Sequence, residues 1–402
     1  MNNYSNLNKM VTLSNPSWDI AKKTGLASLE VDYDTSPYLM YEGQRIINMC
    51  SCSYLGLDTN ADILLGAIEG IRRAGALHLT TARTRLSITL LGDLERALSE
   101  HYQGDAISYI SCSAATSGFL PLFASGALTA EKKSVIVFDK FAHFSMNHVK
   151  PICADETEIS TCPHNDMDYL ETICKQRDSV AYVADGTYSV EGCTPISDLL
   201  YLQDKYGLYL YLDDSHGLSI TGQRGEGYVL STLGDLNDRT VVVGSLAKAF
   251  GTCGGMLISG NTTFKEKLVR YGNPWSQYLN SAGIGATLAS LALHNTPLLT
   301  TLQTSWRKNL AILDSFFACL NRHTDSPIRV ILLESDLHAI NAATELLRQG
   351  YYTSSVFFPI VPKGTAGLRV MPRADISETE MAAFCQALKK VCESSINNEA
   401  LA

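Results

Sequence analysis

Lys248 lies in a stretch whose residue types are suited to covalent chemistry with a carbonyl compound. The β-branched run 241–243 predicts a buried strand, and two small residues, Gly244 and Ser245, lead from it to the lysine. Burial lowers the pKa of a lysine because it disfavours the ammonium form, and a neutral amine can form a Schiff base. The ordinary alternative is a surface lysine with its charge in solvent. The apolar and glycine neighbours favour a nucleophilic amine in a dry pocket.

A second stretch upstream supplies a carboxylate and an imidazole. The hydrophobic run 208–212 predicts a strand, Asp213 follows at its end, and His216 comes three residues later. A carboxylate at the end of a strand can pair with the pyridinium nitrogen of pyridoxal phosphate (PLP), which keeps the ring protonated and able to accept electrons. A single Asp at such a place is also a common cap of the next turn. The combination with Lys248 about thirty-five residues later is much rarer by chance and predicts a PLP site.

The elements that must position these residues alternate between strands and helices. We expect strands over 106–110, 134–138, 182–185 and 208–212, and helices over 61–75 and 199–206. This alternation predicts an α/β fold with a mostly parallel sheet that helices cover on both faces. Functional residues then gather at the carboxyl ends of the strands, and Asp213, His143 and Ser189 each follow a predicted strand.

Small residues between a strand and a helix predict a phosphate site. Residues 111–118 are rich in Ser, Ala and Gly and precede an apolar helix. Backbone N–H groups and the positive end of the helix dipole would point into such a turn.

Composition limits the class of protein. The chain has 402 residues, 46% of them hydrophobic and 18% charged, which predicts a globular α/β protein with two lobes. The net charge of −9 and the lack of a basic run argue against nucleic-acid binding. The eleven cysteines lack zinc-site spacing, so we expect reduced thiols, no metal site and a cytoplasmic location. Neither a signal peptide nor a membrane span is expected.

The two motifs around Asp213 and Lys248 resemble those of the α-oxoamine synthase family of fold-type-I PLP enzymes. The resemblance extends from about residue 45 to about residue 390. It implies a large PLP-binding domain and a smaller C-terminal α+β domain. We expect an N-terminal arm over 1–60, the large domain over 61–283 and the small domain over 284–402.

The resemblance also implies roles for individual residues around the cofactor. His143 would stack on the ring, with the nearby His148 as an alternative, and Tyr278–Ser281 would reach the phosphate of the neighbouring subunit in a homodimer with shared active sites. The remaining cofactor contacts would come from Ser113 and Ala114 at the phosphate, Ser245 at the phosphate, and Ser189 and His216 at the phenolic oxygen.

Substrate recognition is expected to depend on Arg369. In the family an arginine at this position holds the α-carboxylate of the amino acid, because a planar guanidinium binds a carboxylate with two parallel hydrogen bonds. Ser53 stands where relatives carry an asparagine that touches the same carboxylate. A hydroxyl is shorter than an amide and donates one hydrogen bond. Together with Ala114, where relatives often have a bulkier residue, this departure predicts an unusual substrate.

Three further arginines depart from the family pattern. Segment 77–95 lacks the glycines of relatives, and Arg83 and Arg85 compete there for one arginine position. They could meet an anionic acyl donor, and solvation at the surface is an equal alternative. Arg373 is an additional charge close in sequence to Arg369.

The implied activity is a decarboxylative condensation of an α-amino acid with an acyl thioester, carried by coenzyme A or a carrier protein, to give an α-aminoketone. Lys248, His143 and Asp213 would be the catalytic residues. An aminotransferase or an amino-acid lyase of the same fold is the alternative. A relative that has lost PLP and serves as a binding partner is a third possibility, which the competent residues at every cofactor position disfavour.

Overall fold

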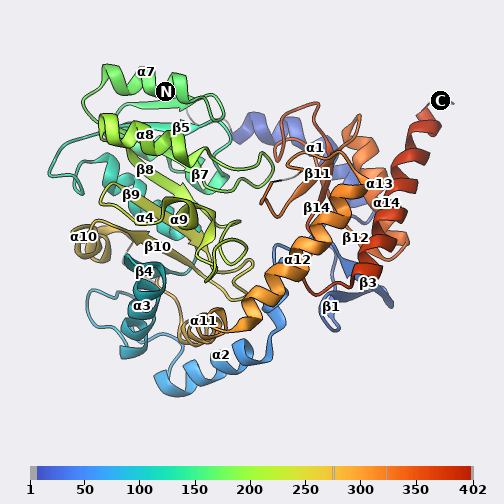
Figure 1. Cartoon of the computed structure of the whole chain (residues 1–402), viewed down its shortest axis with the longest axis horizontal. Helices are drawn as coiled ribbons and strands as arrows, with labels where there is room; N and C mark the ends of the chain where they lie inside the picture. Colours follow the sequence, from blue (N-terminus) through green and yellow to red (C-terminus); the bar gives the residue numbers. More distant parts are fainter. Residues whose placement is uncertain (1–6, 274, 276, 323, 400–402) are drawn as a thin grey trace. The chain divides into compact units, whose positions relative to one another are not determined.

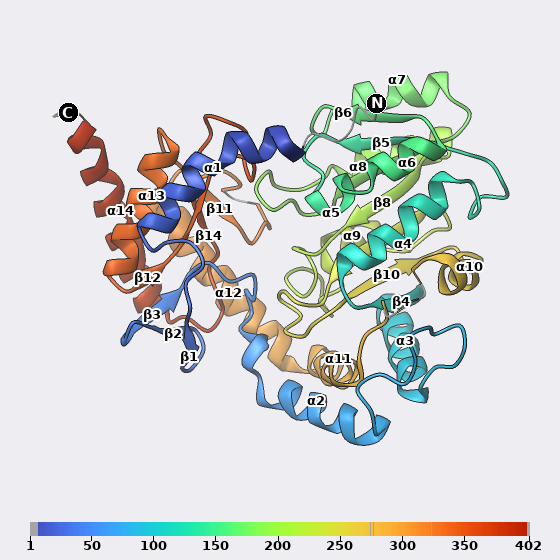
Figure 2. The same ribbon diagram turned by 180° about the vertical axis from the view of Figure 1, so that it is seen from behind.

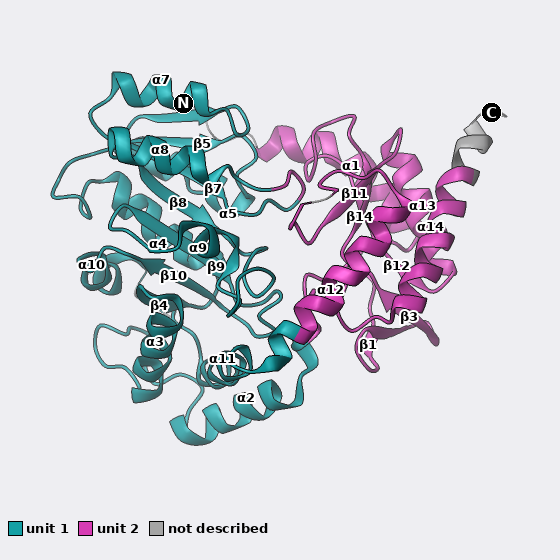
Figure 3. Cartoon of the chain, viewed as in Figure 1, with its two compact units in different colours: residues 1–4, 57–189, 193–300 teal, residues 5–56, 190–192, 301–402 magenta. Residues whose placement is uncertain are grey.

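The computed structural model describes residues 7–273, 275, 277–322 and 324–399, with side chains as far as residue 393. The chain divides into two compact units (Figure 3). Among the described residues, the first contains 57–189 and 193–300, and the second contains 7–56, 190–192 and those from 301 onward. Residues 284–300 therefore belong with the first unit, and the segment expected to be an N-terminal arm belongs almost entirely to the second.

A seven-stranded sheet forms the centre of the first unit (Figure 1). Its order is β4-β10-β9-β8-β7-β5-β6. The five strands from β9 to β6 are parallel, β10 is antiparallel to both of its neighbours, and β4 therefore has the direction of β9. The prediction of a mostly parallel sheet is confirmed. The bounds are β4 Asp105–Tyr109, β5 Val135–Asp139, β6 Ile159–Cys162, β7 Val180–Asp185, β8 Tyr209–Asp213, β9 Thr240–Ser245 and β10 Gly255–Ser259.

Helices cover both faces of this sheet. Side chains alternate between the two faces along each strand, and apolar side chains on both faces must be buried. In β9, Val242 belongs to one hydrophobic core, and Val241 and Val243 belong to the other. Figure 1 shows α8 and α9 on one face, and Figure 2 shows α4, α5 and α6 on the opposite face. The helices are α2 Ala61–Ala74, α3 Thr89–Tyr102, α4 Cys112–Ala124, α5 Phe144–Asn147, α6 Lys150–Glu156, α7 Met167–Gln176, α8 Ile196–Tyr206, α9 Gly227–Leu233, α10 Phe264–Tyr271 and α11 Ser281–His294, after the short 3₁₀ helix η1 Leu57–Thr59.

Helix α2 ends where the sequence predicts. The Asn60 side chain accepts hydrogen bonds from the first turn, and Gly75 closes the helix in the left-handed region at φ 68°. The helix packs closely on α11. A Cβ atom added at Gly70 would lie only 2.2 Å from the carbonyl oxygen of Ser281, so the contact needs a glycine. This contact fixes the beginning of α11, where Ser281 is the first residue.

The second unit contains two small sheets, β1-β2-β3-β12 and β11-β14-β13. Its core is a third hydrophobic cluster that includes Leu313, Leu346 and Phe384. Ser377 and Glu380 form a capping box at the start of α14, because each side chain accepts a hydrogen bond from the backbone N–H of the other residue. The elements are α1 Leu7–Lys23, β1 Asp32–Tyr33, β2 Tyr38–Tyr41, β3 Gln44–Asn48, β11 Arg329–Leu332, α13 Asp336–Arg348, β12 Tyr351–Tyr352, β13 Ser354–Val356, β14 Gly367–Val370 and α14 Glu378–Glu399, and α12 Pro297–Phe316 begins in the first unit.

Within the described ranges, every helix is too short or too polar to span a lipid bilayer.

Candidate active site

The carboxyl ends of β4, β7, β8 and β9 meet at one edge of the large sheet, and the strand register brings their last residues into rows. Asp213 at the end of β8 pairs with Asp185 of β7 and Val243 of β9. Gly255 of β10 pairs with both Ser245 and Tyr109. The loops that follow β4, β7, β8 and β9 therefore leave the sheet close together, and they carry most of the residues expected to bind the cofactor.

Lys248 and His216 face each other at this edge. The Nζ atom of Lys248 lies 2.8 Å from Nε2 of His216. The imidazole is buried, with 3% of its surface exposed, and the lysine is half-buried. Two residues that are 32 positions apart in the sequence are thus in hydrogen-bond contact. Lys248 is not the solvent-facing lysine of the ordinary alternative.

Asp213 is buried and receives hydrogen bonds on both carboxylate oxygens. Its Oδ1 atom accepts from the hydroxyl of Ser215 at 2.5 Å and from the N–H of the same residue at 3.0 Å. Its Oδ2 atom lies 3.4 Å from the sulfur of Cys112. Burial, and next the charge of Asp213, raise the pKa of the Cys112 thiol well above its ordinary value, so this sulfur keeps its proton.

The neighbouring carboxylate, Asp214, has a different role. It accepts a hydrogen bond from the N–H of Val229 at 2.9 Å and one from the hydroxyl of Thr187 at 3.2 Å. Burial raises the pKa of Asp214 to about 7. Its oxygens are occupied with holding two loops together, which leaves Asp213 as the carboxylate of the site.

Helix α4 begins beside Asp213 and presents free N–H groups. The first turn of an α-helix has no internal acceptors for its N–H groups. The Ser111 side chain caps the helix and accepts from the N–H of Ala114 at 3.1 Å. The N–H groups of Cys112 and Ser113 have no partner in the part of the chain that the structure describes, and the Ser113 side chain is exposed. At the end of β9, the half-buried Ser245 donates its N–H to the Ser215 hydroxyl at 2.8 Å.

His143 is tied to the same edge of the sheet. The backbone N–H of His143 donates to a carboxylate oxygen of Asp185 at 2.8 Å. The Nδ1 atom of its imidazole lies 2.9 Å from the hydroxyl of Ser145. His143 is an exposed residue. The alternative, His148, caps the other end of α5 and lies against the ring of Phe144.

Ser189 and Ser281 differ in how far they are engaged. Ser189 follows β7, is half-buried and forms no side-chain hydrogen bond with any part of the chain that the structure describes. Ser281 is buried, and its hydroxyl donates to the carbonyl oxygen of Ala76 at 2.7 Å. Its predicted contact with the phosphate of a neighbouring subunit stays a prediction.

The two residues expected to recognise the amino acid lie in the second unit. Arg369 is in β14, is half-buried, and its Nε atom is buried without a hydrogen-bond partner. No carboxylate of the residues described here forms an ion pair with it. Ser53 is buried in the turn that precedes Tyr54.

A family model for aminotransferase class I and II matches residues 44–388. The chain belongs to this family. Among curated relatives, the 8-amino-7-oxononanoate synthase of Alkaliphilus metalliredigens is 28% identical over 88% of this chain and 89% of its own length. The enzyme of the same name from Bordetella petrii is 27% identical over 83% and 85%. These relatives confirm the prediction that the chain is similar to the α-oxoamine synthases, a group of PLP enzymes.

Solved structures confirm the fold-type-I fold. Serine palmitoyltransferase of Sphingomonas wittichii has a TM-score of 0.82 at 19% identity and covers 96% of this chain and 98% of that one. A serine palmitoyltransferase solved with PLP has the same TM-score and identity over 96% and 99%. The 8-amino-7-oxononanoate synthase of Francisella tularensis has a TM-score of 0.70 at 19% identity over 89% and 99%. These solved structures share the architecture described above.

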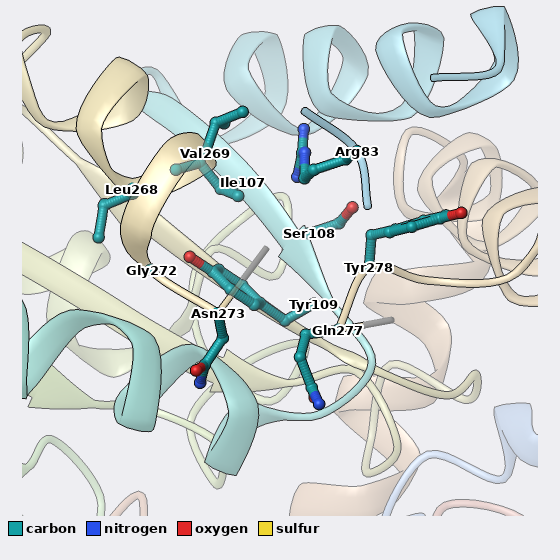
Figure 4. Close-up of a pocket in the computed structure, with 10 residues that line it drawn as sticks. All are labelled: Arg83, Ile107, Ser108, Tyr109, Leu268, Val269, Gly272, Asn273, Gln277 and Tyr278. Atoms are coloured by element: carbon teal, nitrogen blue, oxygen red, sulfur yellow. The ribbon is translucent and has the colours of Figure 1, made fainter. Parts of the chain in front are cut away.

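Two of the three additional arginines have internal partners. Arg83 forms two hydrogen bonds of 2.9 Å with the carboxylate of Glu95. It lines a small pocket beside β4 together with Ser108 and Tyr278 (Figure 4). Arg373 is buried and donates to Asp375 at 2.8 and 2.7 Å. Arg85 is exposed.

Sequence reasoning missed Cys112 and Ser215. Both lie inside stretches that it selected, since Cys112 is the first residue of α4 and Ser215 separates Asp213 from His216. For Ser215 the local signal was its hydroxyl, a hydrogen-bond donor two residues after Asp213. The contact between Cys112 and Asp213 joins positions 101 residues apart and has no local signal.

Proposed function

We propose that this chain is a PLP-dependent enzyme that condenses an α-amino acid with an acyl thioester. In the overall reaction a bond forms between Cα and the acyl carbon, the thioester C–S bond breaks, and the bond from Cα to the carboxylate breaks. The products are an α-aminoketone, CO₂ and a free thiol, with one proton taken up. The observation that carries the proposal is the contact between Lys248 and His216 at the edge where Asp213 and the start of α4 meet.

The residues at this edge fit PLP. When bound, PLP supplies an electron-withdrawing ring that accepts the electron pair released at Cα. A buried carboxylate, Asp213, is available for the ring nitrogen. The free N–H groups of Cys112 and Ser113 at the helix N-terminus suit a phosphate. The exposed imidazole of His143 suits the aromatic ring.

Lys248 is the group placed to move a proton at Cα of the amino acid. Its nitrogen is held 2.8 Å from His216, which orients the amine and limits its rotation. A positioned side chain of this kind raises the rate of proton transfer by about 10²- to 10⁴-fold. Asp213 would hold the ring nitrogen of PLP and would favour its protonated form, because a carboxylate beside a pyridinium favours the charged form.

Arg369 is proposed to hold the carboxylate of the amino acid. A half-buried guanidinium without an acidic partner among the described residues is a site prepared for an external anion. Near it, Ser53 replaces the longer asparagine side chain of the family, which supports an amino acid different from that of the relatives.

The chain is further proposed to act as a cytoplasmic homodimer. The outer face of α2 exposes four large apolar side chains, Leu64, Leu65, Ile68 and Ile71, each at least 40% exposed. An apolar helical stripe of this kind is typical of a protein interface. All eleven cysteines are free thiols, which supports a reducing compartment.

The proposal is tested with purified protein, PLP, single amino acids and acyl-coenzyme A thioesters of different chain length. We expect release of coenzyme A and CO₂ in equal amounts, and loss of both in Lys248→Ala. The Lys267→Ala variant, which alters an exposed lysine that bonds the carbonyl oxygen of Ala127, is the matched control. An oxo acid formed without any acyl donor would instead assign the chain to the aminotransferases, and absence of a visible PLP absorbance band would exclude PLP chemistry.

A further inference from the structure

The carboxylate of Asp213 is clamped by two side chains from different elements. Ser215 holds Oδ1 from the loop after β8, and Cys112 holds Oδ2 from the first turn of α4. All three side chains are buried, with between 3% and 9% of their surface exposed. The carboxylate is therefore shielded from water on the sides that these residues occupy.

The direction of each hydrogen bond follows from the available protons. The N–H of Ser245 donates to the Ser215 hydroxyl oxygen at 2.8 Å, so that oxygen acts as an acceptor there. The single proton of the same hydroxyl then goes to Asp213, 2.5 Å away, rather than to the Cys112 sulfur at 3.7 Å. The Cys112 thiol likewise has one proton, and the carboxylate oxygen at 3.4 Å is its acceptor.

The clamp joins the parts of the site. Ser245 is three residues before Lys248 in the sequence, and Ser215 directly precedes His216. The Ser215 hydroxyl bonds both Ser245 at the end of β9 and Asp213 at the end of β8. Cys112 bonds the first turn of α4 to the Asp213 carboxylate. A displacement of Asp213 would disturb all of these contacts.

We propose that Cys112 and Ser215 are positioning residues that orient Asp213 toward the ring nitrogen of PLP. The inference rests on the proposed function, because it assigns the ring nitrogen to Asp213. Donors on both oxygens hold a carboxylate in one orientation. The two donors also determine which lone pairs of the Asp213 carboxylate are left to accept from the ring nitrogen of PLP.

The test compares PLP with an analogue in which the ring nitrogen is replaced by C–H, 1-deazapyridoxal 5′-phosphate. Affinities of both compounds for the apoprotein are measured for the wild type, Cys112→Ala and Ser215→Ala. We expect PLP binding to weaken about fivefold in Cys112→Ala and about tenfold in Ser215→Ala. Binding of the analogue should change less than about twofold, because it lacks the atom that Asp213 contacts.

Matched controls separate positioning from general packing. Cys174→Ala alters a buried cysteine of α7, and Ser231→Ala alters a serine of α9 that bonds within its own helix. Neither should change the ratio of the two affinities. Cys112→Ser and Ser215→Thr keep a donor and should retain the wild-type ratio, and they carry the test if an alanine variant does not fold.

Equal losses for PLP and the analogue, or unchanged PLP affinity in both alanine variants, would overturn the inference. Failure of the wild type to bind PLP would instead overturn the proposed function, so the two failures are distinguishable.

Discussion

Nζ of Lys248 and Nε2 of His216 lie 2.8 Å apart, and this contact joins the loop after β9 to the loop after β8. Both atoms are nitrogens, and the tautomer of the imidazole decides which of them donates the proton. The buried ring thereby holds the amine in one orientation. Replacement of His216 by Phe should lower kcat by about 100-fold.

The measurement is steady-state release of coenzyme A by His216→Phe, with PLP content determined in parallel. His148→Phe, at an exposed histidine, is the control and should keep wild-type activity. A variant that retains both PLP and full activity would show that the contact has no role in proton transfer.

Arg369 should determine the affinity for the amino acid. Replacement by Leu removes two charge-assisted hydrogen bonds to the substrate carboxylate and should raise KM for the amino acid about 100-fold, equivalent to about 3 kcal/mol. KM for the acyl thioester should not change. Initial rates over a range of each substrate provide the measurement, and Arg348→Leu, at a surface arginine of α13, is the control. A parallel rise in both KM values would argue against this role.

Arg83 should stabilise the fold rather than bind substrate. Its ion pair with Glu95 is largely buried, with 11% and 6% of the two side chains exposed. Arg83→Leu leaves the carboxylate of Glu95 without this partner and should lower the free energy of unfolding by about 3 kcal/mol. Arg85→Leu, at an exposed position, should change it by less than about 0.5 kcal/mol. Denaturant unfolding of both variants tests the difference, and equal stabilities would contradict it.

His294 should make stability depend on pH. Its Nδ1–H donates to the carbonyl oxygen of Ser290 at 2.7 Å, so Nε2 accepts from the Ser219 hydroxyl at 2.8 Å. Burial lowers the pKa of His294 to about 4 from its ordinary value near 6.5. As pH falls, His294 therefore takes up a proton in the unfolded chain before it does so in the folded protein. The stability contributed by the neutral ring is complete above pH 6.5 and is lost as pH falls toward 4.

Between pH 7 and pH 5 this histidine should cost the wild type about 2 kcal/mol of unfolding free energy. The value is obtained as the difference in pH dependence between the wild type and His294→Gln in denaturant unfolding. His148→Gln, at an exposed histidine, should leave the pH dependence unchanged. An identical profile for the wild type and His294→Gln would refute the prediction.

The apolar face of α2 should mediate dimer formation. Charges introduced by the double variant Leu65→Glu/Ile68→Glu would be buried in the interface at high cost. We expect light scattering to give twice the chain mass of 43.8 kDa for the wild type and the single-chain mass for the variant. Ile152→Glu, at a residue of α6 with 52% exposure, is the control and should remain a dimer. A monomeric wild type would contradict the prediction directly.

Much of the first unit follows from local patterns in the sequence. Four of the five residues of the run 208–212 lie in β8, and the run 241–243 lies in β9, because buried parallel strands consist of continuous hydrophobic residues. Asp213 directly follows its run, and Lys248 follows the other run after a short loop of small and apolar residues. The second unit was predicted less completely, since β3 pairs with β12 about 300 residues later and no local pattern marks that pairing.

The sequence by itself determined the order of the elements, the acid and the amine of the site, and the small-residue turn that begins α4. These properties depend on residue types within a few positions of each other. Only the tertiary structure decided that Asp213, and not Asp214, meets Cys112, and that Arg83 pairs with Glu95. The physical reason is that adjacent residues at the end of a strand point to opposite faces, so the partner of each side chain is set by the helices that pack on that face.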